Sequence, residues 1–245
     1  MRKIISLLAI GAAMLYSGSA NAALYNIEFN GYPDPGTIAR PSQQYSGKGA
    51  VLGATGDYWN IETGISSGPT ALLDSKKNSS GISFAYSGTA AGNIGPTSPS
   101  NGFNGTPYAK LMSDYISVQP GHTGLLIFNG LKSGVTYTLY VYSQGVVGSN
   151  NGLIVNGVSA ITNNAGASSF DATNLYVTSF TASGTSKTIT FDDPGTNSRS
   201  RGLINGLQLS TPVPEPSSVA LVGIGGLLLV AFQLKRSGAL SGFNV

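Results

Sequence analysis

The chain has 245 residues, no cysteine and a formal net charge of +3. The excess positive charge lies at the two ends, because the segment 23–211 holds nine basic and nine acidic residues in no run. A neutral segment lacks the concentrated positive surface that nucleic-acid binding requires. The absence of cysteine excludes thiol nucleophiles and cysteine-ligated metal sites.

The first 22 residues have the three parts of a secretory signal peptide. Met1-Arg2-Lys3 is a short basic region, residues 4–16 form a short apolar run, and Ala20-Asn21-Ala22 is an Ala-x-Ala cleavage site. We therefore expect export by the secretion translocon, cleavage by signal peptidase and a mature chain that begins at Ala23. An uncleaved membrane anchor is the alternative, which the shortness of the apolar run disfavours.

Residues 23–211 predict an all-β domain, because apolar and polar residues alternate and no stretch has a helical period. In the clearest strand, 135–142, the odd-numbered residues form one apolar face and the even-numbered ones a Thr/Tyr face. A polar face of this kind is expected to be half exposed. Further strands are predicted at 24–29, 81–86, 125–128, 153–155, 158–161, 175–180, 188–191 and 203–209.

Turn residues separate these strands. Asn156-Gly157 predicts a type I′ hairpin, since both central residues of that turn need a positive φ. Many short strands with even turns predict a sandwich or a barrel, and we expect a two-sheet, jelly-roll-like β-sandwich. The Gly-, Ser- and Pro-rich segment 87–105 is predicted to be a flexible surface loop, with a ligand-facing lid as the alternative.

A series of short motifs, from Gly56-Asp57-Tyr58-Trp59 through 130–142 to 204–209, resembles the galactose-binding-domain-like jelly rolls of exported bacterial proteins. The resemblance implies a carbohydrate-binding role without identifying a sugar. Rings that stack on pyranose faces are the residues such a role needs. The candidates are Trp59, Tyr58, Tyr140 and Tyr142, and the alternative for Trp59 is a place in the core.

Candidates for metal binding and catalysis are few. Asp192 and Asp193 at a strand end could bind a structural Ca²⁺, which the resembled jelly rolls often hold, although Asp-Pro-Gly is first a turn former. The single histidine, His122, lies in a turn, and no Gly-x-Ser-x-Gly motif is present. Asp57 and Glu62 bracket Trp59 and are the acid pair considered for glycoside hydrolysis. We expect a protein that is not an enzyme.

The C-terminal segment 212–236 has three parts in a fixed order. Pro214-Glu215-Pro216 precedes an apolar run, 219–234, which is followed by Lys235-Arg236 and a polar tail, 237–245. As a helix the run would measure about 24 Å against a hydrocarbon core of about 30 Å, so spanning requires membrane thinning or snorkelling. The arrangement resembles the PEP-CTERM sorting signal. That resemblance implies that an exosortase recognises Pro-Glu-Pro and removes the tail, with the basic pair as the membrane stop.

These features predict an inner-membrane-anchored intermediate that is released to the cell envelope, the surface or the extracellular matrix. The function we expect is that of a non-catalytic carbohydrate-binding or matrix module associated with exopolysaccharide or biofilm. The alternatives are a purely structural matrix protein without a small ligand and, less favoured, a secreted glycoside hydrolase.

Overall fold

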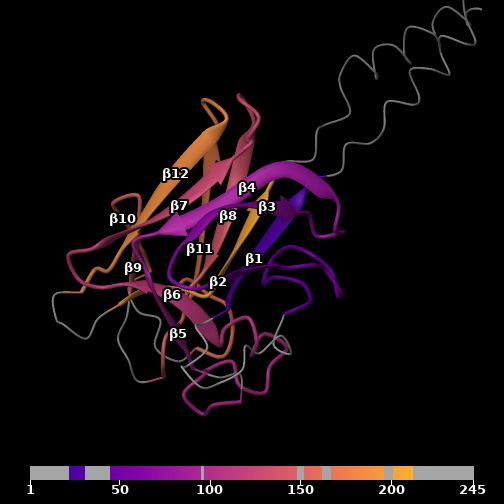
Figure 1. Cartoon of the computed structure of the whole chain (residues 1–245). Helices are drawn as coiled ribbons and strands as arrows, with labels where there is room; N and C mark the ends of the chain where they lie inside the picture. Colours follow the sequence, from indigo (N-terminus) through magenta and orange to yellow (C-terminus); the bar gives the residue numbers. More distant parts are fainter. Residues whose placement is uncertain are drawn as a thin grey trace, which may run out of the picture. The chain divides into compact units, whose positions relative to one another are not determined.

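The computed structural model describes residues 22–30, 45–94, 97–147, 152–161, 167–195 and 201–211 (Figure 1). Ala23–Pro212 forms one compact unit. Its regular elements are all strands, which confirms the predicted all-β class. The signal peptide, the apolar run 219–234 and the tail 237–245 lie outside the described residues. Within the described ranges, no helix is long and apolar enough to cross a membrane.

Two large sheets form a sandwich, and a small third sheet adjoins them. The five-stranded sheet has the order β11 (Leu175–Thr181), β8 (Thr136–Tyr142), β14 (Gly206–Ser210), β1 (Leu24–Asn30), β2 (Asn60–Thr63). The six-stranded sheet has the order β10 (Val158–Ile161), β9 (Leu153–Val155), β12 (Ser186–Asp192), β7 (Thr123–Asn129), β4 (Ser79–Ser87), β3 (Ser67–Leu73). The third sheet has the order β13 (Gly202–Ile204), β6 (Asp114–Val118), β5 (Ala90–Asn93). Paired strands are antiparallel except β1 and β2.

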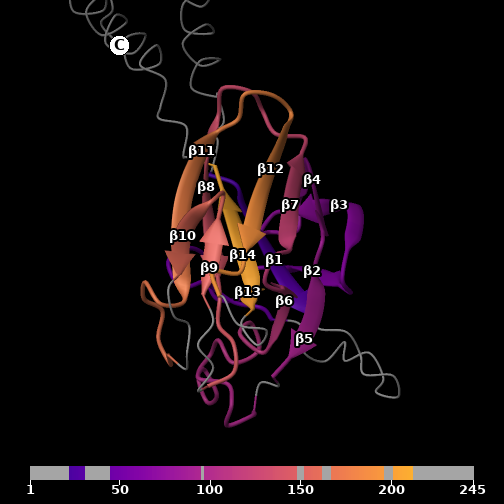
Figure 2. The same ribbon diagram turned by 90° about the vertical axis from the view of Figure 1, so that its left-hand side faces the viewer.

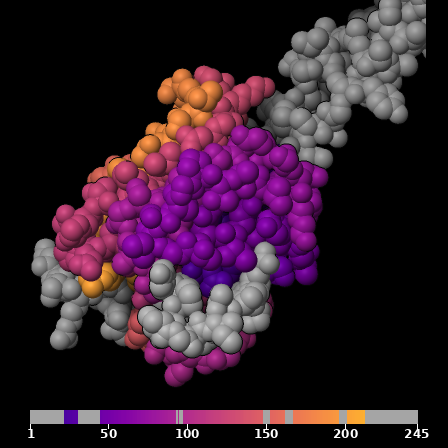
Figure 3. Space-filling model, in the orientation of Figure 1, coloured from indigo at the N-terminus to yellow at the C-terminus, as the bar shows by residue number. Residues whose placement is uncertain are grey.

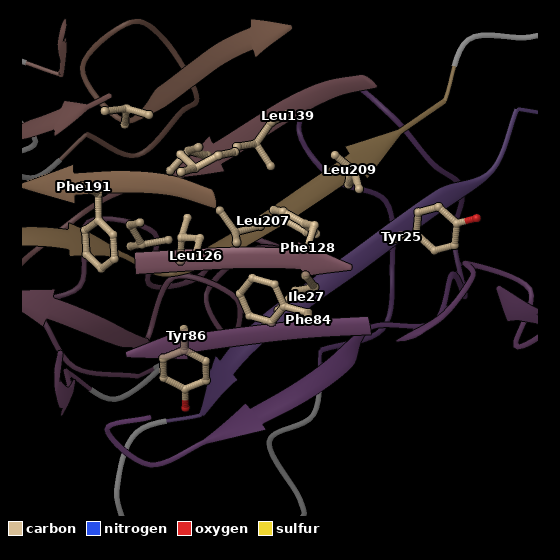
Figure 4. Close-up of a cluster of buried hydrophobic side chains, with 14 of the residues drawn as sticks. Tyr25, Ile27, Phe84, Tyr86, Leu126, Phe128, Leu139, Phe191, Leu207 and Leu209 are labelled. Atoms are coloured by element: carbon tan, nitrogen blue, oxygen red, sulfur yellow. The ribbon is translucent and has the colours of Figure 1, made fainter. Parts of the chain in front are cut away.

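The main core lies between the two large sheets (Figure 4). Ile27 of β1 and Leu139 of β8 face Phe84 of β4 and Phe128 of β7, and all four are fully buried. Each such side chain contributes about 1.5–3 kcal/mol by leaving water. The predicted apolar face of β8 is therefore the inner face of its sheet.

Most predicted strands are present, and the Asn-Gly hairpin is confirmed. Asn156 has φ 50° and Gly157 has φ 74°, the pair of positive values that a type I′ turn requires. The single strand predicted at 203–209 is instead two strands of different sheets, β13 and β14. Asn205 separates them, because its Nδ2 donates to the carbonyls of Met112 (3.3 Å) and Asp114 (2.9 Å) and fixes a corner there.

The segment 87–105 is only partly the loop that we predicted. It contains β5, and the side chains of Asn101 and Phe103 are buried. The Asn101 Oδ1 accepts from the Phe103 N–H at 2.9 Å, and its Nδ2 donates to the Ala109 carbonyl at 3.1 Å, so local bonds order these turns. Residues 97–113 lie at one end of the sandwich, opposite the β7–β8 and β11–β12 turns (Figures 1, 2 and 3).

Candidate functional site

The outer face of the five-stranded sheet, which points away from the main core, is covered over part of its area. A second apolar cluster covers it, formed by residues of the segment 45–59, the turns 97–113 and β8. Its buried members are Tyr45, Trp59, Phe103, Leu111, Met112 and Tyr142. We call the rest of this surface, over β8 and β11, the open face.

Trp59 and Tyr142 belong to this second cluster, and neither side chain is exposed. The Trp59 Nε1 donates to the Gly47 carbonyl at 2.8 Å, and the ring meets Tyr45 edge-on with centroids 5.2 Å apart. The Tyr142 hydroxyl donates to the Gln208 Oε1 at 2.5 Å and accepts from the Ala50 N–H at 3.0 Å. The structure therefore contradicts the prediction that these two rings stack on a sugar and places Trp59 in the core, as its alternative proposed.

Buried amides attach the covering segment to the sheet. The Gln208 Nε2 donates to the Asn26 Oδ1 at 2.7 Å, and the Asn26 Nδ2 donates to the Tyr58 carbonyl at 2.8 Å. Asn26 and Gln208 are both fully buried. Because buried polar groups are costly without partners, these bonds select one position of the segment 45–59 on the outer face.

Two carboxylates are also buried at the covered end. Glu28 is 1% exposed, and its Oε2 accepts from the Tyr45 N–H at 2.8 Å. Burial raises the pKa of Glu28 to about 8; the Asp114 carboxylate adds to the rise, whereas the Tyr45 N–H and Lys110 oppose it. Asp114 is 2% exposed and accepts from the Ser113 hydroxyl at 3.0 Å. Sealed in this way, the two acids do not face a ligand.

Tyr58 and Tyr140, the other two predicted rings, are half-buried. The Nζ of Lys77 lies 5.4 Å from the centroid of the Tyr58 ring and occupies one of its faces. Tyr140 lies on the outer face of β8, where it pairs with Val177 of β11 on one side and Gln208 of β14 on the other. Of the four predicted rings, Tyr140 is therefore the one best placed to meet a ligand.

Hydroxyl groups continue the open face beyond Tyr140. Thr138 and Ser179 share a hydrogen bond of 3.0 Å, and Thr136 and Thr181 share one of 2.9 Å. Each pair joins β8 to β11 directly, and the register places both pairs on the side of the sheet that carries Tyr140. An aromatic ring thus borders a row of hydroxyls on the outer face of the sheet.

Sequence reasoning missed two rings at the margin of the second cluster, Tyr108 and Phe170. Their centroids lie 4.8 Å apart in an edge-to-face arrangement, and both side chains are half-buried. Both pack against the second cluster, as does Tyr140. They lie outside the strands, where no alternation of apolar and polar residues marks them. Tyr108 also lies next to the segment 87–105, which was predicted to be a loop.

The residues considered for catalysis differ in their surroundings. Asp57 pairs with the Nζ of Lys76 at 2.6 Å, and Glu62 is 3% exposed, with a pKa that burial raises. His122 is exposed and borders a hollow of about 200 Å³ between the β4–β5 turn and β6. No carboxylate is among the residues that line this hollow.

Asp192 and Asp193, the predicted calcium ligands, make separate local hydrogen bonds. The Thr123 hydroxyl donates to the Asp192 Oδ1 at 2.6 Å, and the Gly195 N–H donates to the Asp193 Oδ1 at 2.7 Å. The second bond is that of a turn-forming aspartate. Nowhere in the described part of the chain do three or more His, Asp or Glu side chains form a group that could hold a metal ion. Calcium binding stays a prediction.

Comparison with known families identifies the C-terminal segment, which lies outside the described residues. Residues 212–237 match the family described as PEP-CTERM protein-sorting motif, which includes Pro214, Glu215, Pro216, Lys235 and Arg236. The chain therefore carries an exosortase sorting signal, as predicted. The match supports an exported protein that passes through a membrane-anchored intermediate and is processed by an exosortase. No curated protein sequence matches the chain.

Among solved structures, the domain is similar to plant receptor ectodomains. The ANX2 ectodomain from Arabidopsis thaliana is 12% identical with a TM-score of 0.41, covering 79% of this chain and 53% of that one. A plant complex of the peptide RALF23 with FER and LLG2 gives 9% identity and a TM-score of 0.37, covering 78% of this chain and 40% of that one. The chain thus spans about half or less of these larger proteins.

Proposed function

We propose that residues 23–211 form a non-catalytic carbohydrate-binding module. Sorting by an exosortase would bring this module to the cell envelope or to exopolysaccharide. The observation that carries the proposal is the open face, where the half-buried ring of Tyr140 borders the hydroxyls of Thr138 and Ser179. A ring fixed at its base and open on its outer side presents an apolar surface to a pyranose at low entropic cost. The neighbouring hydroxyls supply donors and acceptors for sugar hydroxyls.

Delivery follows from the two terminal signals. The signal peptide leads the chain into the translocon, and signal peptidase cuts after Ala22. The run 219–234 then halts translocation with Lys235 and Arg236 on the cytoplasmic side. The exosortase cuts near Pro-Glu-Pro, 214–216, and releases the domain outside.

The positions of the acidic side chains argue against a hydrolase. A glycosidase needs two carboxyl groups that flank a cleft about 5 to 9.5 Å apart. Asp57 is held by Lys76, while Glu28 and Asp114 are buried beneath the second cluster. We therefore propose binding rather than hydrolysis.

The test is a glycan array together with an exopolysaccharide pull-down, both with and without Ca²⁺. It uses residues 23–211, which match the compact unit that contains both cores. Tyr140→Ala should weaken binding about tenfold, equivalent to about 1.4 kcal/mol. Tyr58→Ala is the matched control, since it also removes a half-buried tyrosine but one whose ring faces Lys77, and it should bind as the wild type does.

Saturable binding that Tyr140→Ala leaves unchanged would remove the open face as the site. Absence of binding to every glycan would favour the alternative, a structural matrix protein without a small ligand. The neutral surface of the domain, rich in Ser, Thr and Asn, would suit that role.

A further inference from the structure

The edges of the three sheets differ in how they are protected. An edge strand exposes unpaired N–H and C=O groups that can pair with another chain, and proteins usually prevent this with short strands, bulges, proline or charge. In the described part of the chain, β11 and β2 are the edges of the five-stranded sheet, β10 and β3 those of the six-stranded sheet, and β13 and β5 those of the third sheet.

Five of these six edges carry a protective feature. β2, β5, β10 and β13 have three or four residues each. β10 also has a register shift, and β3 has two such shifts together with Pro69. Each of these edges is therefore a poor template for a further strand.

The strand β11 has none of these features. Its seven residues, Leu-Tyr-Val-Thr-Ser-Phe-Thr, include no charge, proline or glycine, and all seven pair with β8 in unbroken register. The two hydroxyl pairs described above hold it to β8 on the outer side. On the inner side, Phe180 stacks on Tyr137 with centroids 5.7 Å apart, and the Nζ of Lys187 lies 5.6 Å from the Phe180 centroid. The result is a firmly held and regular edge whose own side chains are uncharged, and the Val177 side chain is 47% exposed.

We propose that β11 pairs with β11 of a second copy of this chain, antiparallel about a two-fold axis, so that the two five-stranded sheets become one continuous sheet. The strand is chemically self-complementary in this arrangement. With Thr178 opposite Thr178 of the second copy, Val177 lies opposite Ser179 and Tyr176 lies opposite Phe180. Aromatic cross-strand pairs of this kind stabilise antiparallel sheets, and the same pair occurs twice in a symmetric dimer.

Charge does not oppose a second copy as the occupant of this edge. β11 has no charged side chain, and residues 23–211 hold equal numbers of acidic and basic residues, so two copies approach without net repulsion. The pairing joins the two open faces on the same side of the continuous sheet, with the β8 strands three strand spacings apart, roughly 14 Å. The Tyr140 rings of both copies could then bind the same polysaccharide chain. The strand pairing itself does not depend on sugar binding.

The test is sedimentation equilibrium of residues 23–211 over a wide range of protein concentration. The wild type should form a dimer, and Val177→Lys should raise its dissociation constant about tenfold or more, because a lysine at the edge opposes pairing. Val158→Lys is the matched control: it changes another exposed valine, 58% exposed, on the shorter edge β10, and it should dimerise as the wild type does.

Ser179→Lys, at an exposed position of the same edge, is the second variant and keeps the test valid if Val177→Lys does not fold. A wild type that stays monomeric at every concentration would overturn the proposal. So would a dimer that both edge lysines leave intact, or one that Val158→Lys weakens as much as Val177→Lys does.

Discussion

The buried carboxyl group of Glu28 should make the stability of the domain depend on pH in an unusual direction. Its pKa is raised from 4.5 to about 8 in the folded protein, chiefly by burial. The folded state therefore holds a proton that the unfolded chain releases above about pH 4.5. Because the folded pKa is the higher one, this contribution to stability is fully present below about pH 4.5 and is lost as the pH rises toward 8.

The size of the effect follows from the shift. A difference of about 3.5 pH units at 1.36 kcal/mol per unit is roughly 5 kcal/mol between acid and mildly alkaline solution. That is comparable to the whole stability of many domains, about 5–15 kcal/mol. The raised pKa of the buried Glu62 adds a slope of the same sign.

Replacing Glu28 with Gln should remove most of this slope, since an amide keeps the shape of the protonated carboxyl and does not titrate. Urea unfolding measured from about pH 5 to about pH 8 reads the free energy of unfolding directly. Trp59 is a convenient probe, because it is the one tryptophan of the chain and is fully buried. In the wild type the free energy of unfolding should fall with pH, and in Glu28→Gln it should fall much less, because only the contribution of Glu62 remains.

Asp171→Asn serves as the control. Hydrogen bonds from the Thr173 hydroxyl and N–H lower the pKa of Asp171 below 3.8, so it does not titrate in this range. The Asp171→Asn variant should change the free energy of unfolding by the same amount at every pH, without changing its slope against pH. An equal slope in Glu28→Gln and the wild type would refute the assignment of the pH dependence to Glu28.

Two further predictions test the core and the sorting signal. Trp59→Ala should cost about 3–5 kcal/mol, seen as a lower melting temperature, because it opens a cavity in the second cluster; an unchanged melting temperature would contradict the core placement. In cells with a working exosortase, mass spectrometry should find mature chains that end near Pro-Glu-Pro, 214–216, whereas deletion of these three residues should leave the tail 237–245 attached. An intact C-terminus in the unaltered protein would count against processing.

The sequence predicted the strands that face one shared core. β1, β4, β8 and β12 alternate because one side of each faces the main core and the other carries mainly polar side chains, which in β1 are also buried. β7 instead contains the apolar run 125–128. The edges β2, β3 and β5 and the interior strand β6 escaped prediction. β2, β5 and β6 are short, β3 contains Gly68 and Pro69, and β6 is buried at four of its five positions, so it does not alternate.

The candidate site could be predicted only in part, for a reason that lies in long-range packing. Tyr140 and Tyr142 share one face of β8, and nothing in their local sequence distinguishes them. The segment 45–59 covers Tyr142 but covers Tyr140 only partly. The contact with Tyr142 is made by residues about 90 positions away in the chain, such as Ala50. Alternation identifies a face, but it does not show which part of that face another segment covers.

Partial covering of the outer face links the proposed binding site to the proposed dimer. The segment 45–59 and the turns 97–113 bury Trp59, Tyr142 and Glu28 at one end. Hydrogen bonds from Asn26 and Gln208 to the carbonyls of Tyr58 and Leu52 hold this segment over β1 and β14. Beyond this segment the described residues leave β8 and β11 uncovered, so Tyr140 is half-buried at the boundary and Val177 is exposed at the edge beside it. The proposed sugar-binding surface and the proposed self-pairing strand thus both depend on which part of the outer face the segment 45–59 covers. In this protein the ring that borders the cover, rather than the conspicuous tryptophan beneath it, is the residue on which a functional test should begin.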